Sequence, residues 1–446
     1  MKRQLRVAFV FFCLCLPGPG RAQNSAAPSG PPLNGEWQLT TVAWGNELRE
    51  RMNLQVEKGK VSGWIYEHGK RAPIVGTADS NGIRWETHDA TGKDVYSGRV
   101  EGEEIVGNMV SSGPEVWGES APLPWRARRA PSLPPGEPRT IDFEPVEFHR
   151  FFSASIPAAL RIRPGDVVRT KTVDAAGVDE KGKARVLGGN PQTGPFYVEG
   201  AMPGDVLAIH VRKLRLNRTT AISDDGLVNR ALTTEYAGEH RDNEFKNVVW
   251  NLDPERGMAS PGRATEHLKG LAVPVRPMLG CVGVAPGFGA APVRTGDSGW
   301  FGGNMDFNEV REGATVYLPV AQPGALLYFG DGHALQGDGE LNGNALETSL
   351  DVEISVDVLR EKHLAGPRVE NAEYLMAMGL SGSLDEAFRE ASSALAEWLQ
   401  QDYKLTGPES AILLGATIEF QISEVADRNV GVVAKVRKKY LPGANR

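Results

Sequence analysis

Residues 323–340 read PGALLYFGDGHALQGDGE: a tight Pro-Gly turn, a run of five apolar residues and then a glycine-rich segment that carries several acids. A short apolar run that directly follows a turn of this kind is typical of a β-strand. The same arrangement recurs at residues 163–168, 202–207 and 312–316. The chain is therefore predicted to be rich in sheet.

The region before residue 130 has a different rhythm. Residues 35–129 contain short alternating segments such as Val61–Tyr66, broken by glycine and charged turns about every 8 to 12 residues. This pattern predicts a small antiparallel β domain, either a barrel or a sandwich. The proline-rich residues 130–139 are unsuited to a sheet ladder and are interpreted as a linker. Residues 140–446 then form a second domain.

The helix signals are concentrated near the C-terminus. Ser383 can cap a helix with Glu386 three residues on, and a second helix is expected from Pro408. The first helix is predicted to bury a stripe made of Leu384, Ala387, Phe388, Ala391, Leu395, Trp398 and Leu399. Residues 418–423 alternate as a strand that buries one face through Ile418, Phe420 and Ile422. The predicted fold class is mainly β, of the β-rich α+β type, with a sandwich-like or barrel-like second domain and a few C-terminal helices.

The first residues resemble a secretory leader. Residues 1–22 carry basic residues, a short apolar run and a small-residue cleavage site, and the polar, proline-rich residues 23–34 are predicted to be disordered. We therefore expect an exported protein, periplasmic or secreted, without membrane insertion. The four basic residues of the leader leave with it, so the formal net charge falls from −7 to −11. Nucleic acid is an improbable partner for such a chain. Cys281 is the one cysteine left, which excludes an intramolecular disulfide.

The acids in the opening stretch are spaced by two residues. In an extended chain Asp331 and His333 point to one side, and so do Asp338 and Glu340. Asn304 and Asp306 have the same spacing upstream, and Glu347 follows downstream. Buried carboxylates repel, and a divalent cation or a shared proton removes that cost. The alternative is an ordinary β-turn without a functional site, because glycine and aspartate are common in any β-turn.

The run from Gly302 to Glu347 contains GGNMD followed by GDGHALQGDGE, and it resembles the acetamidase/formamidase family of amide hydrolases. The segments Asn190–Pro195 and Gly280–Pro286 share this resemblance, which covers roughly residues 140–440. It implies a β-rich amidase domain that hydrolyses a small linear amide to ammonia and a carboxylic acid. It also implies a divalent ion such as zinc or calcium, and a homo-oligomer. One departure is that Gly188 and Gly189 stand where some relatives have a histidine before the NP-x-TGP motif, which leaves the role of Asn190 open.

Site residues are carried over from the family motifs as a hypothesis. The candidate metal ligands are Asp306, Asp331, His333, Asp174 and Glu347, and the candidate catalytic residues are Glu340, Asp338, Gln336 and Asn304. A carboxylate, Glu340 or Asp338, would move the proton that the departing nitrogen needs, and Gln336 or Asn304 could donate to the oxyanion. Zinc is the first choice of ion. Calcium or magnesium stays open, because the motif offers one histidine and several oxygen ligands.

Two other interpretations were weighed. Cys281 lies in an apolar run that predicts a buried strand, where a thiol is inert. The chain could also be a secreted, non-catalytic ligand-binding protein on an amidase fold. Retention of the whole acidic set argues against that alternative.

Overall fold

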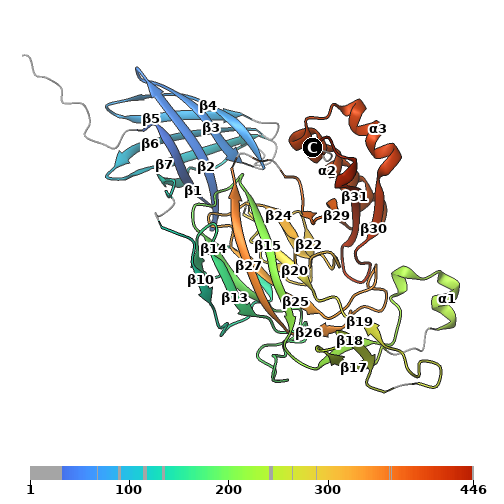
Figure 1. Cartoon of the computed structure of the whole chain (residues 1–446). Coiled ribbons are helices and arrows are strands. Elements are labelled where there is room, and N and C mark those ends of the chain that lie inside the picture. The colour runs from blue at the N-terminus through green and yellow to red at the C-terminus, as the bar shows by residue number, and fades with distance from the viewer. Residues whose placement is uncertain are drawn as a thin grey trace, which may run out of the picture.

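The computed structural model describes residues 33–67, 69–88, 92–113, 118–132, 136–240, 245–263, 265–287, 289–360, 362 and 364–443. The predicted signal peptide 1–22, and the predicted leader up to residue 32, lie outside these residues. The mainly β fold class is confirmed: strands occur throughout the described chain, and the two long helices lie near its C-terminus (Figure 1).

The N-terminal strands close into an antiparallel barrel. Its strands are β1 (Gly35–Ala43), β2 (Asn46–Glu57), β3 (Lys60–Glu67), β4 (Lys70–Asp79), β5 (Gly82–His88), β6 (Lys93–Glu101), β7 (Glu104–Gly113), β8 (Gly118–Glu119) and β9 (Leu123–Arg129). Pairing of β6 with β7 closes the ring, and β8 pairs only with β7. Alternate residues point inward, and Trp85 stacks on Tyr96 against the edge of Trp125. The predicted alternation therefore produces a closed barrel with a packed interior.

Two large sheets form the rest of the molecule. The first runs in the spatial order β10, β13, β27, β15, β24, β28, β29, β31, β30. Its strands are β10 (Thr140–Asp142), β13 (Val167–Lys171), β15 (Val206–Leu216), β24 (Thr315–Pro319), β27 (Leu350–Leu359), β28 (Arg368–Glu370), β29 (Tyr374–Ser381), β30 (Glu419–Ile422) and β31 (Val430–Arg437).

The second sheet has the path β19, β18, β17, β16, β26, β25, β20, β23, β22, and β14 joins it beside β25 with β12 next to it. Its strands are β12 (Leu160–Ile162), β14 (Gln192–Val198), β16 (Thr220–Asp224), β17 (Asn247–Asp253), β18 (Met258–Pro261), β19 (Val273–Pro274), β20 (Met278–Val284), β22 (Ser298–Gly299), β23 (Gly302–Asn304), β25 (Leu327–His333) and β26 (Glu347–Thr348). A separate small pair joins β11 (Phe151–Phe152) to β21 (Val293–Arg294).

The main hydrophobic core draws on both sheets. Leu207 and Ile354 come from the first sheet, and Val282 and Phe329 come from the second. All seven residues of β20 and all seven of β25 are buried. These two strands are covered on both faces, which explains why the sequence around them is almost continuously apolar.

The C-terminal helices pack on one face of β29 and β31. They are α2 (Leu384–Tyr403), capped by Ser383 as predicted, and α3 (Gly407–Thr417), capped by Thr406 one position earlier than expected. The buried face of α2 consists of Ala387, Ala391, Ala394, Leu395, Trp398 and Leu399. Leu384 and Phe388 are exposed, so the predicted stripe is too wide at its start.

The strand β30 is oriented opposite to the prediction. Phe420 and Ile422 face outward, because β30 is the last strand of its sheet and Phe420 is covered only in part by the ring of Phe388. The polar face of β30 is instead the better covered one. There Glu419 accepts hydrogen bonds from Tyr374 and Arg437.

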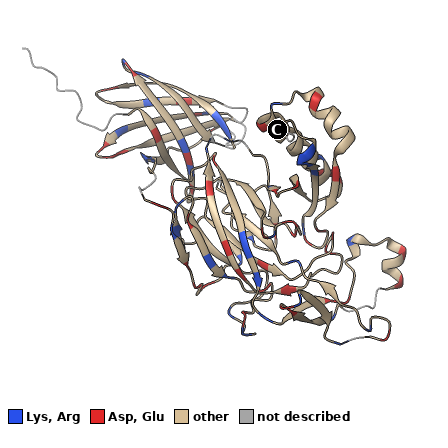
Figure 2. Ribbon diagram, viewed as in Figure 1, with Lys and Arg blue, Asp and Glu red and all other residues tan. Residues whose placement is uncertain are grey.

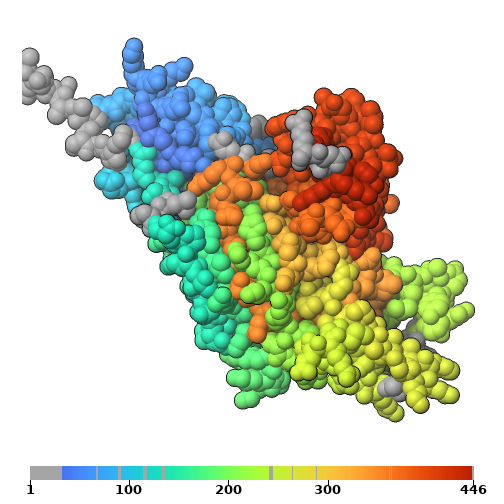
Figure 3. Space-filling view, in the orientation of Figure 1, coloured from blue at the N-terminus to red at the C-terminus, as the bar shows by residue number. Residues whose placement is uncertain are grey.

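One short helix, α1 (Thr234–Glu239), was not expected. It lies on an excursion between β16 and β17 that projects from the body of the molecule (Figure 3). Short 3-10 turns cover Asn229–Ala231 and Lys438–Tyr440. None of the helices in the described part is long and apolar enough to cross a bilayer.

A buried ion pair connects the N-terminal barrel to the region that contains the two large sheets. Arg51 of β2 donates to Asp205 at 2.8 Å and to Glu36 at 2.6 Å, and the Asp205 side chain has no exposed surface. Elsewhere acidic and basic residues alternate over the ribbon without a large region of one sign (Figure 2). The division into domains at residues 130–139 stays a prediction.

Candidate active site

The strand β25 brings Asp331 and His333 into the centre of the molecule. Both are almost fully buried, and the neighbouring strand β20 presents Gly280 opposite them. A Cβ atom at Gly280 would lie 2.5 Å from Asp331 Oδ2, 2.9 Å from His333 Cε1 and closer still to Asp306 Oδ1. Glycine at this position therefore leaves the floor of a cradle open for three functional side chains.

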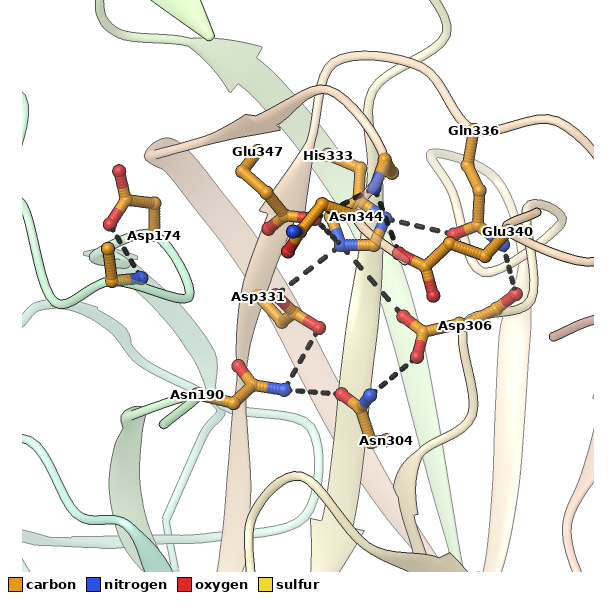
Figure 4. A network of polar contacts seen from close by, with 12 residues as sticks. Asp174, Asn190, Asn304, Asp306, Asp331, His333, Gln336, Glu340, Asn344 and Glu347 are labelled. Atoms are coloured by element: carbon orange, nitrogen blue, oxygen red, sulfur yellow. Dashed lines mark hydrogen bonds and ion pairs between the residues drawn. The ribbon is translucent and has the colours of Figure 1, made fainter. Parts of the chain in front are cut away.

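Asp306 enters the same cradle from the turn that follows β23. The backbone N–H groups of Met305 and Asp306 both donate to the carbonyl oxygen of Gly280 at 3.0 Å, which fixes the turn over β20. Asn304, the last residue of β23, donates from Nδ2 to Asp306 Oδ2 at 2.5 Å. The side chains of Asn304 and Asp306 thus lie together at the same cluster, as predicted from their spacing (Figure 4).

Glu340 and Glu347 complete the cluster from the other side. The backbone N–H of Ala345 donates to both, at 2.9 Å to Glu340 Oε1 and 3.1 Å to Glu347 Oε1. The backbone at Ala345 thus holds the two carboxylates near each other, and Figure 4 shows them on either side of the His333 ring. Both side chains are nearly inaccessible to solvent.

His333 is the centre of the cluster. Its Nε2 lies 3.1 Å from Glu347 Oε1, 3.3 Å from Asp331 Oδ1 and 3.9 Å from Asp306 Oδ1. Its Nδ1 lies 2.9 Å from Gln336 Oε1. Gln336 Nε2 donates to the carbonyl oxygens of Asp306 and Ser423, so Gln336 Oε1 accepts and His333 Nδ1 carries the hydrogen. Nε2 is then the ring nitrogen that faces the carboxylates and is available to a proton or a cation.

The donor set fits a divalent cation. Ligand atoms of Asp306, Asp331 and His333 lie within 4.8 Å of one another, and so do those of His333, Glu340 and Glu347. Four buried atoms of the cluster have no hydrogen-bond partner, namely Asp306 Oδ1, Asp331 Oδ1, His333 Nε2 and Glu347 Oε2. Orphaned buried donors and acceptors are costly, and a cation among them removes that cost.

The pKa values of the acids and of His333 in the cluster also favour a bound cation. Burial raises the pKa of Glu347 to about 7 and those of Asp306 and Glu340 well above their usual values. Burial alone would also raise the pKa of Asp331 and lower that of His333. The attraction between these two outweighs burial: it holds the pKa of Asp331 below its usual value and, together with Glu347, raises that of His333. The cluster by itself therefore carries more acid than one imidazolium can neutralise.

The backbone at the site is strained. Nine non-glycine residues of the described chain have positive φ, and four of them belong to this region: Asn190, Asp306, Asp331 and Glu340. Each such residue costs on the order of 1–2 kcal/mol. Strain concentrated in this way is typical of functional sites, where the surrounding structure holds the residues in place.

Two predicted site residues are not brought into the cluster. Asp338 is exposed, and its carboxylate accepts hydrogen bonds from Asn308 at 2.8 Å and Gln421 at 2.7 Å. The prediction that Asp338 and Glu340 point the same way is wrong, because β25 ends at His333 and Glu340 has a φ of 48°. Alternation of side chains holds only within a strand.

Asp174 lies near the cluster but is already neutralised. Arg218 donates to its Oδ2 at 2.6 Å, and the backbone N–H groups of Ala176 and Val178 donate to its Oδ1. Both members of the ion pair are buried. Asp174 therefore acts as a wall of the site, with no free oxygen for an ion.

The amides of Asn304 and Gln336 are also occupied. Asn304 Nδ2 donates one hydrogen bond to Asp306 and the other to Asp427 at 2.6 Å. Gln336 Nε2 donates both of its hydrogen bonds to backbone carbonyl groups. Neither amide is free to stabilise an oxyanion, as the sequence had suggested. They hold the cluster in position instead.

Asn190 and Asp427 join the site, although neither was assigned a role from the sequence. Asn190 donates from Nδ2 to Asp331 Oδ2 at 3.0 Å and to Asn304 Oδ1. It belongs to the NP-x-TGP motif, so its motif was a usable signal. Asp427 follows β30 in a stretch without any motif, and no local pattern marks it.

The cluster opens into a cavity of about 540 Å³. Asp331, Glu340, Glu347, Asn304 and Asp427 reach its surface. The remaining lining residues are Asp174, Ala175, Ala176, Gly188, Gly189, Asn190, Ile222, Asn247, Arg294, Gly296, Asp297, Gly343, Asn344 and Arg428. A small polar substrate can thus reach the acids from solvent.

Cys281 is unsuited to be a nucleophile. It lies fully buried in β20, and burial raises the pKa of its thiol well above the usual value. A protonated, inaccessible thiol does not attack a carbonyl group.

Comparison with known proteins gives consistent matches. Residues 139–289 and 289–427 match the model of the Acetamidase/Formamidase family. A formamidase of Methylophilus methylotrophus is 23% identical over 353 residues, which cover 63% of this chain and 86% of that protein. A curated protein of Schizosaccharomyces pombe is 23% identical over 274 residues, and the chain spans only 65% of its length. The crystal structure of a predicted acetamidase/formamidase from Thermoanaerobacter tengcongensis superimposes with a TM-score of 0.57 at 30% identity, covering 67% of this chain and 96% of that one.

Proposed function

Because this chain belongs to the acetamidase/formamidase family, we propose that it hydrolyses the carbon–nitrogen bond of a small linear amide of the formamide or acetamide type. The observation that carries the proposal is the convergence of Asp306, Asp331 and His333 on the open floor at Gly280, with Glu340 and Glu347 grouped around the same imidazole, below a cavity that solvent reaches. The products would be ammonia and a carboxylic acid.

A divalent ion is part of the proposal. Asp306, Asp331, His333 and Glu347 would hold it, with zinc as the first choice and calcium or magnesium as alternatives for a set rich in carboxylates. Bound there, the ion would supply Lewis acidity that polarises a carbonyl group or water. Gln336 would keep the imidazole in the tautomer whose Nε2 faces the ion.

Glu340 is the carboxylate best placed to move protons. It lies at the cavity surface, and burial together with Glu347 and Asp331 raises its pKa well above the usual value. As a base it would take a proton from the attacking water while the new C–O bond forms. Asp338, the other candidate from the sequence, is excluded from this role by its distance from the cluster.

Export and assembly belong to the same proposal. The leader at residues 1–22 supports a periplasmic or secreted enzyme, and the resemblance to the family supports a homo-oligomer. Immunoblotting of cell fractions and light scattering of the purified protein test these two points separately.

The test of the function is ammonia release. The purified mature protein, supplied in turn with zinc, calcium and magnesium, is incubated with formamide, acetamide and propionamide. We expect turnover with at least one amide, and inactivity with all of them in every metal would favour the non-catalytic binding protein.

Three variants sharpen that test. His333→Ala should remove both the bound ion and turnover, whereas Asp338→Asn, outside the cluster, should retain most of the rate. Cys281→Ser should also remain active. Full activity of His333→Ala in a metal-free sample would contradict the proposed site.

A further inference from the structure

A short C-terminal segment forms one wall of the cavity. Residues 423–429 follow β30 and pair with the segment between β25 and β26 through an isolated bridge between Gly339 and Glu424. From this segment Asp427 and Arg428 reach the cavity surface. The proposed chemistry has assigned no role to either residue.

The backbone of this segment is fixed at several points. Gln336 Nε2 donates to the carbonyl oxygen of Ser423 at 3.0 Å, and the N–H of Val425 donates to the carbonyl oxygen of Gly339 at 3.0 Å. Arg230 donates to the carbonyl oxygen of Asp427 at 2.6 Å, and Asn429 donates to that of Ser298 at 2.5 Å. The position of Asp427 is therefore set largely by contacts to the backbone of this segment, so that its carboxylate is not needed to hold the segment in place.

The carboxylate of Asp427 is held on one side only. Its Oδ2 accepts from Asn304 Nδ2 at 2.6 Å, and Oδ1 has no hydrogen-bond partner among the described residues. The same Asn304 amide donates to Asp306 Oδ2. Asp427 is thus linked to the cluster through one amide and offers its second oxygen to a ligand in the cavity.

The surroundings of Asp427 raise the pKa of its carboxyl group, so more of it is protonated near neutral pH than of an ordinary aspartate. Burial raises its pKa to about 6. The hydrogen bond from Asn304 and the charge of Arg230 oppose burial, and the charges of Asp331 and Asp297 add to it. A carboxyl group of this kind can both accept and release a proton under working conditions.

The other carboxylates at the cavity already have an ion-pair partner or a proposed role. Asp174 pairs with Arg218 at 2.6 Å, and Asp297 lies 3.7 Å from Arg428. Asp331 and Glu347 belong to the group that would hold the ion. Glu340 is already assigned to the attacking water. Asp427 is therefore the carboxylate in the described lining that has no ion-pair partner, no place among those ligands and no role in activating the water.

We propose that Asp427 is the catalytic acid that binds the substrate's amide nitrogen and protonates it as it leaves, a role that rests on the proposed amide hydrolysis. Oδ1 carries the proton and lies against the nitrogen of the substrate amide. After water has added to the carbonyl carbon and Glu340 has taken its proton, Asp427 gives its own proton to the nitrogen while the C–N bond breaks. Ammonia and the carboxylic acid leave, and the proton on Glu340 returns to Asp427 through solvent, so that one amide and one water yield one acid and one ammonia.

The test compares Asp427→Asn with Asp427→Glu in the full mature protein. Asp427→Asn keeps the shape but cannot transfer a proton, so kcat/KM for acetamide should fall about 10²- to 10⁴-fold, as for loss of a general acid. Metal content and the thermal midpoint should stay near those of the wild type. Asp427→Glu, which can donate, should recover part of the rate. Asp357→Asn, an exposed aspartate paired with His210, is the matched control and should retain full activity.

A pH profile separates catalysis from a structural role. A general acid must be protonated, so kcat/KM of the wild type should fall as the pH rises past the pKa of Asp427 in the free enzyme, and this limb should be absent in Asp427→Asn. Retention of a tenth or more of the wild-type kcat/KM by Asp427→Asn would refute the role. Loss of metal in both variants, with no rescue by glutamate, would also overturn it and make Asp427 structural. A wild-type protein without any ammonia release would instead show that the proposed function itself is wrong.

Discussion

Replacing Gly280 by alanine should dismantle the cluster while sparing the fold. The new Cβ would lie 2.5 Å from Asp331 Oδ2, and real Cβ contacts essentially never fall below 3.0 Å, so the carboxylate must retreat by about 0.5 Å. Distances from ligands to a bound ion tolerate only about 0.2 Å. We therefore expect the metal affinity to fall at least ~100-fold, and turnover to fall by a similar factor. Overpacking of the strand should cost about 1–3 kcal/mol of stability.

The assay combines metal titration, ammonia release and thermal unfolding. Gly283→Ala is the matched control on the same strand, because its Cβ would lie 2.8 Å from the Phe152 ring and from the Gly303 nitrogen, away from the acids. It should lose stability and still bind the ion. If Gly280→Ala bound metal with wild-type affinity and hydrolysed amide at the wild-type rate, the inferred convergence on this floor would be refuted.

Three further predictions concern the support of the site. Gln336→Leu removes the acceptor for His333 Nδ1 and should weaken metal binding about 10- to 100-fold in a titration; unchanged affinity would contradict the orienting role. Arg218→Met leaves Asp174 charged and buried, and should cost about 3–5 kcal/mol in denaturant unfolding, part of which the added change Asp174→Asn should restore. Burial raises the pKa of Glu424 from 4.5 to about 8, so its contribution to wild-type stability is complete below pH 4.5 and is lost as the pH rises through 8. Glu424→Gln should lose less stability over that range, and parallel melting curves for the two proteins would exclude this explanation.

Sequence reasoning was strongest where the chain is regular. Alternation within β25 placed Asp331 and His333 together, because side chains two residues apart in a strand share a face. It failed at Asp338, where the strand has ended and the positive φ of Glu340 turns the two acids apart. Burial of Phe420 was also predicted wrongly, because the sequence does not show that β30 is the last strand of its sheet.

The spacing of residues along the sequence does not reveal which groups accept hydrogen bonds from the side-chain amides in the site. From the sequence Asn304 was a reasonable oxyanion donor, but in the structure its second amide hydrogen is donated to Asp427. That contact joins residues 123 positions apart, and no local pattern encodes it. Asp174 likewise looked available until the fold placed Arg218 beside it.

The wall made by residues 423–429 also sets the order in which the site is completed during synthesis. Asp427 follows Glu347 by 80 residues, which take roughly 4 to 16 s to translate at about 5–20 residues per second. For that time the nascent chain contains every proposed ligand in its sequence and lacks the residues of the last wall. A chain that ended before residue 423 would therefore keep these ligands in its sequence and lack Asp427, the acid that we propose for the leaving nitrogen.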